Sequence, residues 1–249
     1  ESDKEFLELF DKKYFDYTKP IKLIYNLVKS NFTEEGIILD FFSGSATTAH
    51  AVMQLNSEDG GNRKFIMVQL PEKTEEKSEA FKAGYKNICE IGKERIRRAG
   101  KKIKEESPLT TQDLDTGFRV LKLDSTNMQD IYYSPKDISQ ADLFSQVDNV
   151  KPDRTGEDLL FQVMLELGAT LDSKIETTTV AGKTIYNVAE GYLVACFDPD
   201  VTDEVVKAIA QMLPAYAVLR DTSMKDDSTA TNFEQIFKTY SPDTVTKIL

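Results

Sequence analysis

Residues 36–55, which read GIILDFFSGSATTAHAVMQL, limit the possible folds of this chain more than any other segment. A short apolar run contains Asp40 near its end, passes through the small residues SGS and opens into a segment with helical spacing. Near-continuous apolar runs are typical of parallel strands that are buried on both faces. We therefore predict a buried strand at residues 37–42 and a helix whose first turn lies near Thr47.

A second strand and two further helices are predicted on either side of this segment. The run KFIMVQL at residues 64–70 predicts another buried strand, and the spacing of apolar residues predicts helices at residues 21–32 and 79–106. Strand, helix, strand and helix in this order form a βαβ unit. We therefore expect an α/β, Rossmann-like fold for residues 1–110, with a seam near residues 107–111.

The second half of the chain has a different pattern. Short strands are predicted around turns at Ala181-Gly182 and Glu190-Gly191, and Gly168 is placed to end a helix. Residues 111–249 are expected to form a smaller α+β domain, with α/β as the alternative. Further predictions here are strands at 117–123 and 215–221, helices at 157–168 and 202–213, a polar irregular segment at 134–156, and a helix that starts at a capping box formed by Asn232 and Gln235.

Composition excludes several classes of protein. Two isolated cysteines and one histidine predict neither a disulfide framework nor a metal site, and no apolar run has the length of a membrane span. The net charge of −11 is the wrong sign for a chain whose main role is to bind phosphates. We expect a cytoplasmic protein that needs no metal and no membrane.

The turn after the first strand is a candidate ligand site, because helix starts offer free N–H groups and small residues let a ligand approach the backbone. The glycine patterns of dinucleotide sites and of P-loops are both absent. S-adenosylmethionine remains as a candidate, with Asp40 near its ammonium group, the Gly44–Ser45 backbone beside its methionine part and Glu72 (or Gln69) near its ribose. The alternative is that residues 40–45 are only a tight turn.

Several segments carry a family resemblance. LDFFSGSATTAHAV resembles the D-x-F-x-G-S-G-T-T motif of the β-class amino-methyltransferases of DNA. YFDYTKPIKLIYNLV resembles the segment that precedes this motif, and RKFIMVQLPE and ICEIGKERIRRAG resemble the following strand and helix of type III restriction-modification methylation (Mod) subunits. TGFRVLKLDSTN and RDTSMKDDSTATNFEQIFKTYSP resemble the C-terminal region of the same subunits, so the resemblance covers almost the whole chain.

The resemblance implies methyl transfer from S-adenosylmethionine to adenine N6 in bacterial DNA. It also implies three partners, namely duplex DNA, a second methylation subunit and a restriction (Res) subunit. The residues that it places at the cofactor are Lys19, Pro20, Asp40, Phe41, Phe42, Ser43, Gly44, Ser45, Thr47, Thr48 and Glu72.

The chain departs from the family pattern in two ways. Ala46 stands where the family usually has a second glycine, and alanine disfavours positive φ. The catalytic (D/N/S)-P-P-(Y/F) motif is absent, because no two of the 8 prolines are adjacent. Since this motif precedes the cofactor motif in the family, we expect the chain to be the C-terminal portion of a longer subunit. We assign no catalytic residue and expect no activity from the chain alone.

The sequence leaves two other functions open. In one of them, the function lies mostly in residues 112–249, which act as a non-catalytic module that assembles subunits. A test of cofactor binding distinguishes this hypothesis from the methyltransferase hypothesis. A nicotinamide-dependent enzyme is disfavoured by the missing glycines. His50 is expected to be a packed or half-exposed helix residue, and the basic segment 93–104 the solvated side of a helix rather than a phosphate site.

Overall fold

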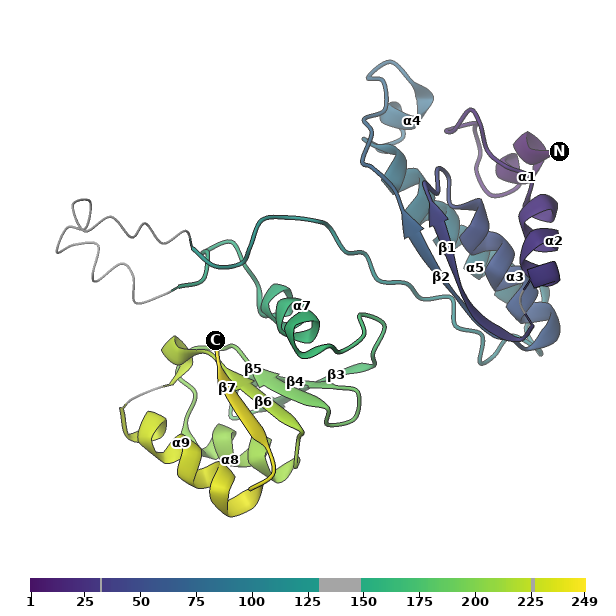
Figure 1. Ribbon diagram of the computed structural model, residues 1–249. Coiled ribbons are helices and arrows are strands. Elements are labelled where there is room, and N and C mark those ends of the chain that lie inside the picture. The colour runs from purple at the N-terminus through teal and green to yellow at the C-terminus, as the bar shows by residue number, and fades with distance from the viewer. Residues whose placement is uncertain (32, 130–148, 225–226) are drawn as a thin grey trace. The chain divides into compact units, whose positions relative to one another are not determined.

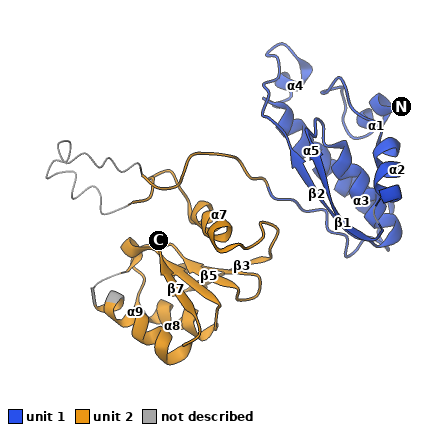
Figure 2. Cartoon of the chain, in the orientation of Figure 1, with its two compact units in different colours: residues 1–119 blue, residues 120–249 orange. Residues whose placement is uncertain are grey.

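The computed structural model describes residues 1–31, 33–129, 149–224 and 227–249. The chain divides into two compact units, residues 1–119 and residues 120–249, coloured blue and orange in Figure 2. Most of the polar segment predicted at 134–156 lies outside the described residues.

Unit 1 contains a parallel pair of strands joined through a helix. Strand β1 (Glu35–Phe41) pairs with β2 (Asn62–Val68), and α3 (Thr47–Asp59) connects them (Figure 1). Among the described residues, four more helices precede or follow this pair, namely α1 (Ser2–Leu7), α2 (Ile21–Asn31), α4 (Glu79–Lys82) and α5 (Ile88–Glu106). The predicted strand-helix-strand order is therefore confirmed. The described sheet of this unit has two strands, so a wider Rossmann-like sheet stays a prediction.

The helices of unit 1 cover one face of this sheet. Ile38 of β1 is 9% exposed and packs with Val28 of α2 and with Val52 and Leu55 of α3. On the other side of α3, buried residues contact α5, with Ala49 and Met53 packed against Ile96, Ala99 and Ile103. Helix α3 therefore lies between the sheet and α5, and its buried residues run from Thr47 to Asn56.

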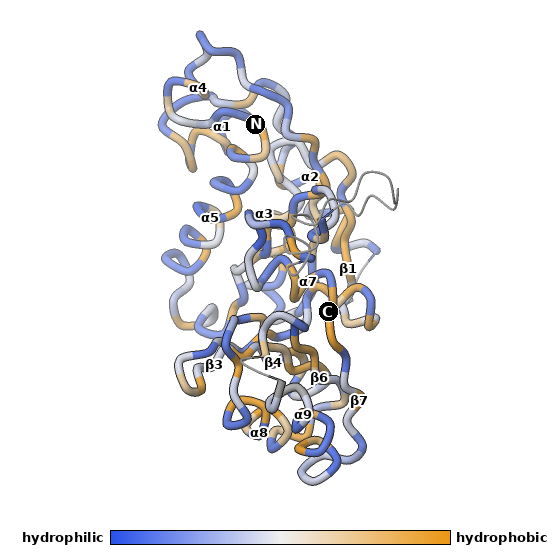
Figure 3. The backbone as a smooth tube through the Cα atoms, turned by 90° about the vertical axis from the view of Figure 1, so that its left-hand side faces the viewer, coloured by the Kyte–Doolittle hydropathy of each residue, from blue (hydrophilic) through white to orange (hydrophobic). Residues whose placement is uncertain are grey.

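The opposite face of the sheet is apolar and exposed. Ile37, Leu39 and Phe41 of β1 are 60%, 61% and 64% exposed, and Ile66 of β2 is 49% exposed. Side chains alternate between the faces of a strand, so these residues point away from the helices that cover Ile38. The prediction that residues 37–42 are buried is thus wrong for one face of the strand. Figure 3 colours most of β1 as hydrophobic, so hydropathy alone does not distinguish its buried face from its exposed face.

The helix predicted at residues 79–106 is two helices. The short α4 (Glu79–Lys82) ends before Gly84, whose φ is +96°, and α5 begins after Asn87. The side chain of Asn87 accepts a 3.2 Å hydrogen bond from the N–H of Glu90. Glycine adopts positive φ without steric cost and asparagine is a favoured N-cap, so this pair breaks the pattern that apolar spacing alone predicted.

Unit 2 contains a mixed sheet of five strands among its described residues, in the order β3-β4-β5-β6-β7. Strands β3 (Ile175–Val180), β4 (Lys183–Val188) and β5 (Leu193–Cys196) are antiparallel neighbours. Strands β6 (Tyr216–Leu219) and β7 (Val245–Ile248) continue the sheet parallel to β5. The predicted turns at Ala181-Gly182 and Glu190-Gly191 are confirmed as the connections between the antiparallel strands.

Helices cover both faces of this sheet. Helix α7 (Gly156–Leu167) packs Leu160 and Met164 against one face, where Leu193 and Val218 are buried. Helices α8 (Asp203–Gln211) and α9 (Asp227–Tyr240) cover the other face, and a short 3-10 helix, η1 (Asp221–Ser223), follows β6. Along the chain, the parallel strands β5, β6 and β7 alternate with the helices α8 and α9. The unit is therefore closer to the α/β alternative than to α+β.

Two predicted elements of the second half differ in the structure. Residues 117–123 are described and form no strand, and they cross the boundary between the units, which lies after Arg119 rather than after residue 110. Helix α9 begins at Asp227, so Asn232 is an interior residue whose side chain donates to Asp203, and the predicted capping box is wrong. The predicted end of α7 is confirmed, because Gly168 is its C-cap at φ +75°.

Candidate functional site

Two hydrogen bonds hold the turn after β1 against the end of β2. The N–H of Ser43 donates to the carbonyl of Val68 at 3.0 Å, and the N–H of Gly44 donates to Oε1 of Gln69 at 2.7 Å. Because the two strands are parallel, their carboxyl ends meet at one edge of the sheet. This is the edge at which open α/β sheets bind ligands.

Two residues of this turn have left-handed backbone conformations. Gly44 has φ +52°, and a Cβ added there would lie 3.3 Å from the ring of Phe15. Ala46, at the N-cap of α3, has φ +60° and ψ +39°. Ala46 thus adopts the left-handed conformation that favours glycine, the residue usual at this position of the motif. This conformation has a steric cost for alanine.

The hydroxyl groups of the turn point into the protein. Ser45, Thr47 and Thr48 are all buried. The hydroxyl of Thr48 donates to Oδ2 of Asp40, which ties the end of β1 to the first turn of α3. The side chains of Ser45 and Thr47 instead meet a guanidinium group.

That group belongs to Arg95 of α5, which the sequence predictions missed. Its Nη1 lies 2.8 Å from the Thr18 and Ser45 hydroxyls and 2.7 Å from that of Thr47, and its side chain is fully buried. Burial lowers the pKa of Arg95 to about 10. A signal was present in the sequence, because Arg95 is four residues from both Ile91 and Ala99 and so lies on the buried stripe of an amphipathic helix.

The segment at Lys19 and Pro20 lies beside the turn, as expected. The hydroxyl of Thr47 lies 3.4 Å from the carbonyl oxygen of Lys19, and the hydroxyls of Ser45 and Thr18 are 3.2 Å apart. The predicted residues that face solvent are Lys19, Phe41, Phe42 and Glu72, while Pro20, Asp40, Ser43 and Gly44 are half-buried. Sequence reasoning left Gln69 and Glu72 open at the ribose; Gln69 is engaged with Gly44, whereas Glu72 is exposed.

His50 is buried one turn into α3. Burial lowers the pKa of His50 to about 3, and its Nδ1 has no hydrogen-bond partner among the described residues. A neutral imidazole without an orienting partner is a packed helix residue, as the sequence predicted. Across the described ranges, no group of three or more His, Cys, Asp or Glu side chains is arranged to hold a metal ion.

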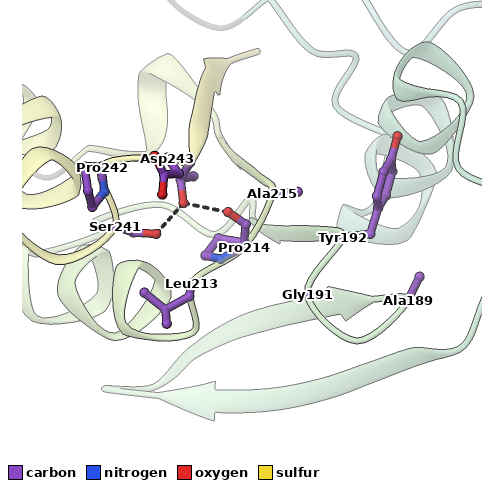
Figure 4. Close-up of a pocket in the computed structure, with 10 residues that line it drawn as sticks. Ala189, Gly191, Tyr192, Leu213, Pro214, Ala215, Ser241, Pro242 and Asp243 are labelled. Carbon is purple, nitrogen blue, oxygen red and sulfur yellow. Dashed lines mark hydrogen bonds between the residues drawn. The ribbon is translucent and has the colours of Figure 1, made fainter.

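Unit 2 has an open surface hollow of about 590 Å³ (Figure 4). Ala189, Tyr192, Leu213 and Pro214 contribute to its lining, and Thr244 donates to the carbonyl of Pro214 at 2.6 Å. These loops precede β5, β6 and β7, so the hollow lies at the amino ends of the parallel strands. Because ligands of open α/β sheets bind at the opposite edge, the turn of unit 1 is the better candidate site.

Comparisons with known proteins agree with the sequence resemblance. Residues 1–102 match the family model described as DNA methylase. The chain is 46% identical over 119 residues to the type III restriction-modification enzyme StyLTI Mod subunit of Salmonella typhimurium. It is 36% identical over 214 residues to the EcoP15I Mod subunit of Escherichia coli, and 34% identical over 216 residues to the EcoPI Mod subunit of Escherichia phage P1. The predicted relation to Mod subunits is thereby confirmed.

The coverage of these matches is unequal. They include 48%, 83% and 84% of this chain but only 18%, 30% and 31% of the three relatives. The chain therefore spans a third or less of the length of each. In the described parts of the chain, no helix is both long and apolar enough to cross a membrane.

Proposed function

Since residues 1–102 belong to the DNA methylase family and most of the chain is related to type III Mod subunits, we propose that unit 1 is part of an S-adenosylmethionine-binding domain. The observation that carries this proposal is the turn at residues 43–46. It lies at the carboxyl edge of a parallel strand pair and leads directly into α3. This position and the family match point to the same ligand.

The inward hydroxyls divide the predicted site residues into two groups. Ser45, Thr47 and Thr48 hold the turn in shape, since their side chains bond to Arg95 and Asp40. The cofactor then meets the backbone of Ser43 and Gly44 and the accessible side chains around it. Asp40 accepts from the ammonium group, Glu72 accepts from the ribose hydroxyls, and Lys19, Pro20, Phe41 and Phe42 form the neighbouring wall.

In the intact protein, the bound cofactor supplies a methyl group to adenine N6. Adenine N6 is a weak nucleophile and is buried in the DNA stack, so such an enzyme has to extrude the base before transfer. The prolines that the family uses for this step are missing from this chain. We therefore propose that the chain alone is inactive, and that duplex DNA, a second methylation subunit and a Res subunit are partners of the intact protein.

The exposed sheet face of unit 1 supports the proposal of an incomplete domain. Parallel sheets occur almost entirely with both faces covered. Here Ile37, Leu39, Phe41 and Ile66 leave a continuous apolar surface in solvent. Further methylase residues that pack on this face would give it the burial that its composition requires.

The first experiment is a calorimetric titration of S-adenosylmethionine into the purified chain. We expect binding that Asp40→Ala abolishes, that NAD does not compete with, and that the control Glu76→Gln, an exposed acid on the loop after β2, leaves unchanged. Competition by NAD would favour a nicotinamide enzyme instead. A methyl-transfer assay on duplex DNA with the same protein is expected to show no product.

Absence of binding would be followed by the same titration on a longer polypeptide that adds the upstream methylase residues. Binding there would assign the rest of the cofactor site to those residues. Absence of binding by both polypeptides would contradict the cofactor proposal and favour the assembly module at residues 112–249.

A further inference from the structure

Arg95 of α5 belongs to neither segment of the proposed cofactor site, yet its side chain hydrogen-bonds to both. Thr18 precedes Lys19 and Pro20, whereas Ser45 and Thr47 belong to the turn after β1. These hydroxyls come from positions far apart in the sequence and converge on a single nitrogen of α5. One guanidinium group therefore links the two segments from behind, in addition to the direct contacts of the Ser45 and Thr47 hydroxyls with Thr18 and Lys19.

The environment of Arg95 is unusual for a cation. The ring of Phe6 lies 5.7 Å from its guanidinium carbon, and Nε and Nη2 have no hydrogen-bond partner among the described residues. Glu5 raises its pKa through a longer-range interaction, but the carboxylate of Glu5 accepts from the N–H of Ile21 at the start of α2. Arg95 thus has three neutral hydroxyl partners and forms no ion pair with any residue that the structure describes.

A buried charge without an ion pair is costly, and well-packed apolar residues of similar volume are often equally or more stabilising. Stability alone is therefore a poor reason for an arginine here. Its hydrogen bonds do something that an apolar side chain cannot do, which is to set the distance between Thr18 and the pair Ser45 and Thr47. The packing of α5 against the turn is also close, because a Cβ added at Gly92 would lie 3.5 Å from the carbonyl oxygen of Gly44.

We propose that Arg95 is a positioning residue for cofactor binding, which fixes the segment at residues 18–20 against the turn at residues 43–47 without contacting the cofactor. This proposal rests on the proposed function of that turn. It assigns a role in ligand affinity to a residue that is fully buried behind the site.

The test compares Arg95→Met and Arg95→Lys with Arg97→Met. Arg97 is on the same helix but its side chain is 58% exposed, so it is a matched control. Loss of outer-shell partners that orient metal ligands costs about tenfold to a hundredfold in affinity, and we expect Arg95→Met to weaken S-adenosylmethionine binding by at least about tenfold. Arg95→Lys keeps a charged donor and is expected to recover part of the affinity, while Arg97→Met leaves it unchanged.

Hydrogen exchange provides a readout that does not need the cofactor. In Arg95→Met, amide exchange is expected to accelerate at residues 18, 19 and 43–47, while the protection of β1, β2 and the rest of α5 is kept. The proposal would be overturned if amide exchange stayed unchanged in both segments and the affinity for S-adenosylmethionine also stayed unchanged. A uniform loss of protection over unit 1 would also overturn it, since Arg95 would then serve folding in general.

Thr18→Val provides a second test of the proposal in case Arg95→Met does not fold. It removes one hydroxyl partner and keeps the shape of the side chain, so amide exchange at residues 18 and 19 is expected to rise with little loss of stability. If neither the unmodified chain nor the longer polypeptide binds S-adenosylmethionine, the proposed function fails, whereas the exchange data still decide whether Arg95 positions the two segments.

Discussion

The N–H of Gly44 donates a 2.7 Å hydrogen bond to Oε1 of Gln69, so a side chain from the end of β2 holds the turn after β1. Gln69→Met removes this acceptor and leaves a half-buried N–H without its partner. We expect a loss of about 1–2 kcal/mol in the free energy of unfolding by urea. Gln54→Met is the control, since the side chain of Gln54 donates to the exposed Glu58 one turn away and has no other hydrogen bond among the described residues. This variant is expected to change stability by less than about 0.5 kcal/mol. Equal losses would mean that the turn does not depend on Gln69.

Ala46 and Ala49 provide a matched test of backbone strain in the turn. Both are buried, but only Ala46 has a left-handed φ, of +60°. Glycine at either position loses one buried methyl group and gains freedom in the unfolded chain. Only at position 46 does it also relieve a steric cost of about 1–2 kcal/mol. We expect Ala46→Gly to be more stable than Ala49→Gly by about that amount in urea unfolding; the opposite order would exclude strain at Ala46.

The single histidine predicts a pH dependence of stability. Burial lowers the pKa of His50 to about 3 from 6.5, so the unfolded chain binds a proton between these values and the folded chain does not. The stability that depends on neutral His50 is present above pH 6.5 and is lost as the pH falls toward 3. The slope approaches about 1.4 kcal/mol per pH unit.

Urea unfolding between pH 7 and pH 5 measures this slope before most carboxylates titrate. His50→Gln is the control, because it removes the titrating group, and its slope in this range is expected to be much smaller. The imidazole proton signals of the folded protein are expected to stay constant over the same range. A midpoint near pH 6.5 in those signals would refute a buried neutral His50.

Adjacent isoleucines of β1 test which face of the sheet carries the core of unit 1. Ile38 is 9% exposed and Ile37 is 60% exposed. Ile38→Thr places a hydroxyl in the packed face and is expected to cost about 2–3 kcal/mol, whereas Ile37→Thr is expected to change stability by less than about 0.5 kcal/mol. Urea unfolding at two protein concentrations measures both. Comparable losses that grow with concentration would mean that another copy of the chain covers the exposed face.

The local elements were largely predictable. The strands of unit 1, the helix after the turn and the Gly168 end of α7 follow from apolar spacing and capping chemistry, and these lie within short segments of chain. The failures are also local in origin. Gly84 and Asn87 break a continuous helical pattern, and the capping box at Asn232 fails because α9 begins earlier, at Asp227.

The candidate site was predictable only in part. The residues of the turn and of the Lys19–Pro20 segment were identified from motifs, and the structure places them side by side. The inward direction of Ser45, Thr47 and Thr48 was not predicted. Whether a hydroxyl faces a ligand or the interior depends on a partner far away in the sequence, in this case Arg95.

Motifs and apolar spacing were enough to predict the similarity to Mod subunits, the order of strands and helices in unit 1, and the residues of the turn, because each depends on nearby residues. The burial of Arg95 among three hydroxyls and the exposure of one apolar face of the β1–β2 sheet are seen in the folded chain alone. Both depend on packing between segments that are distant in the sequence. The same apolar or basic residue can face the core or the solvent without any change in its local pattern.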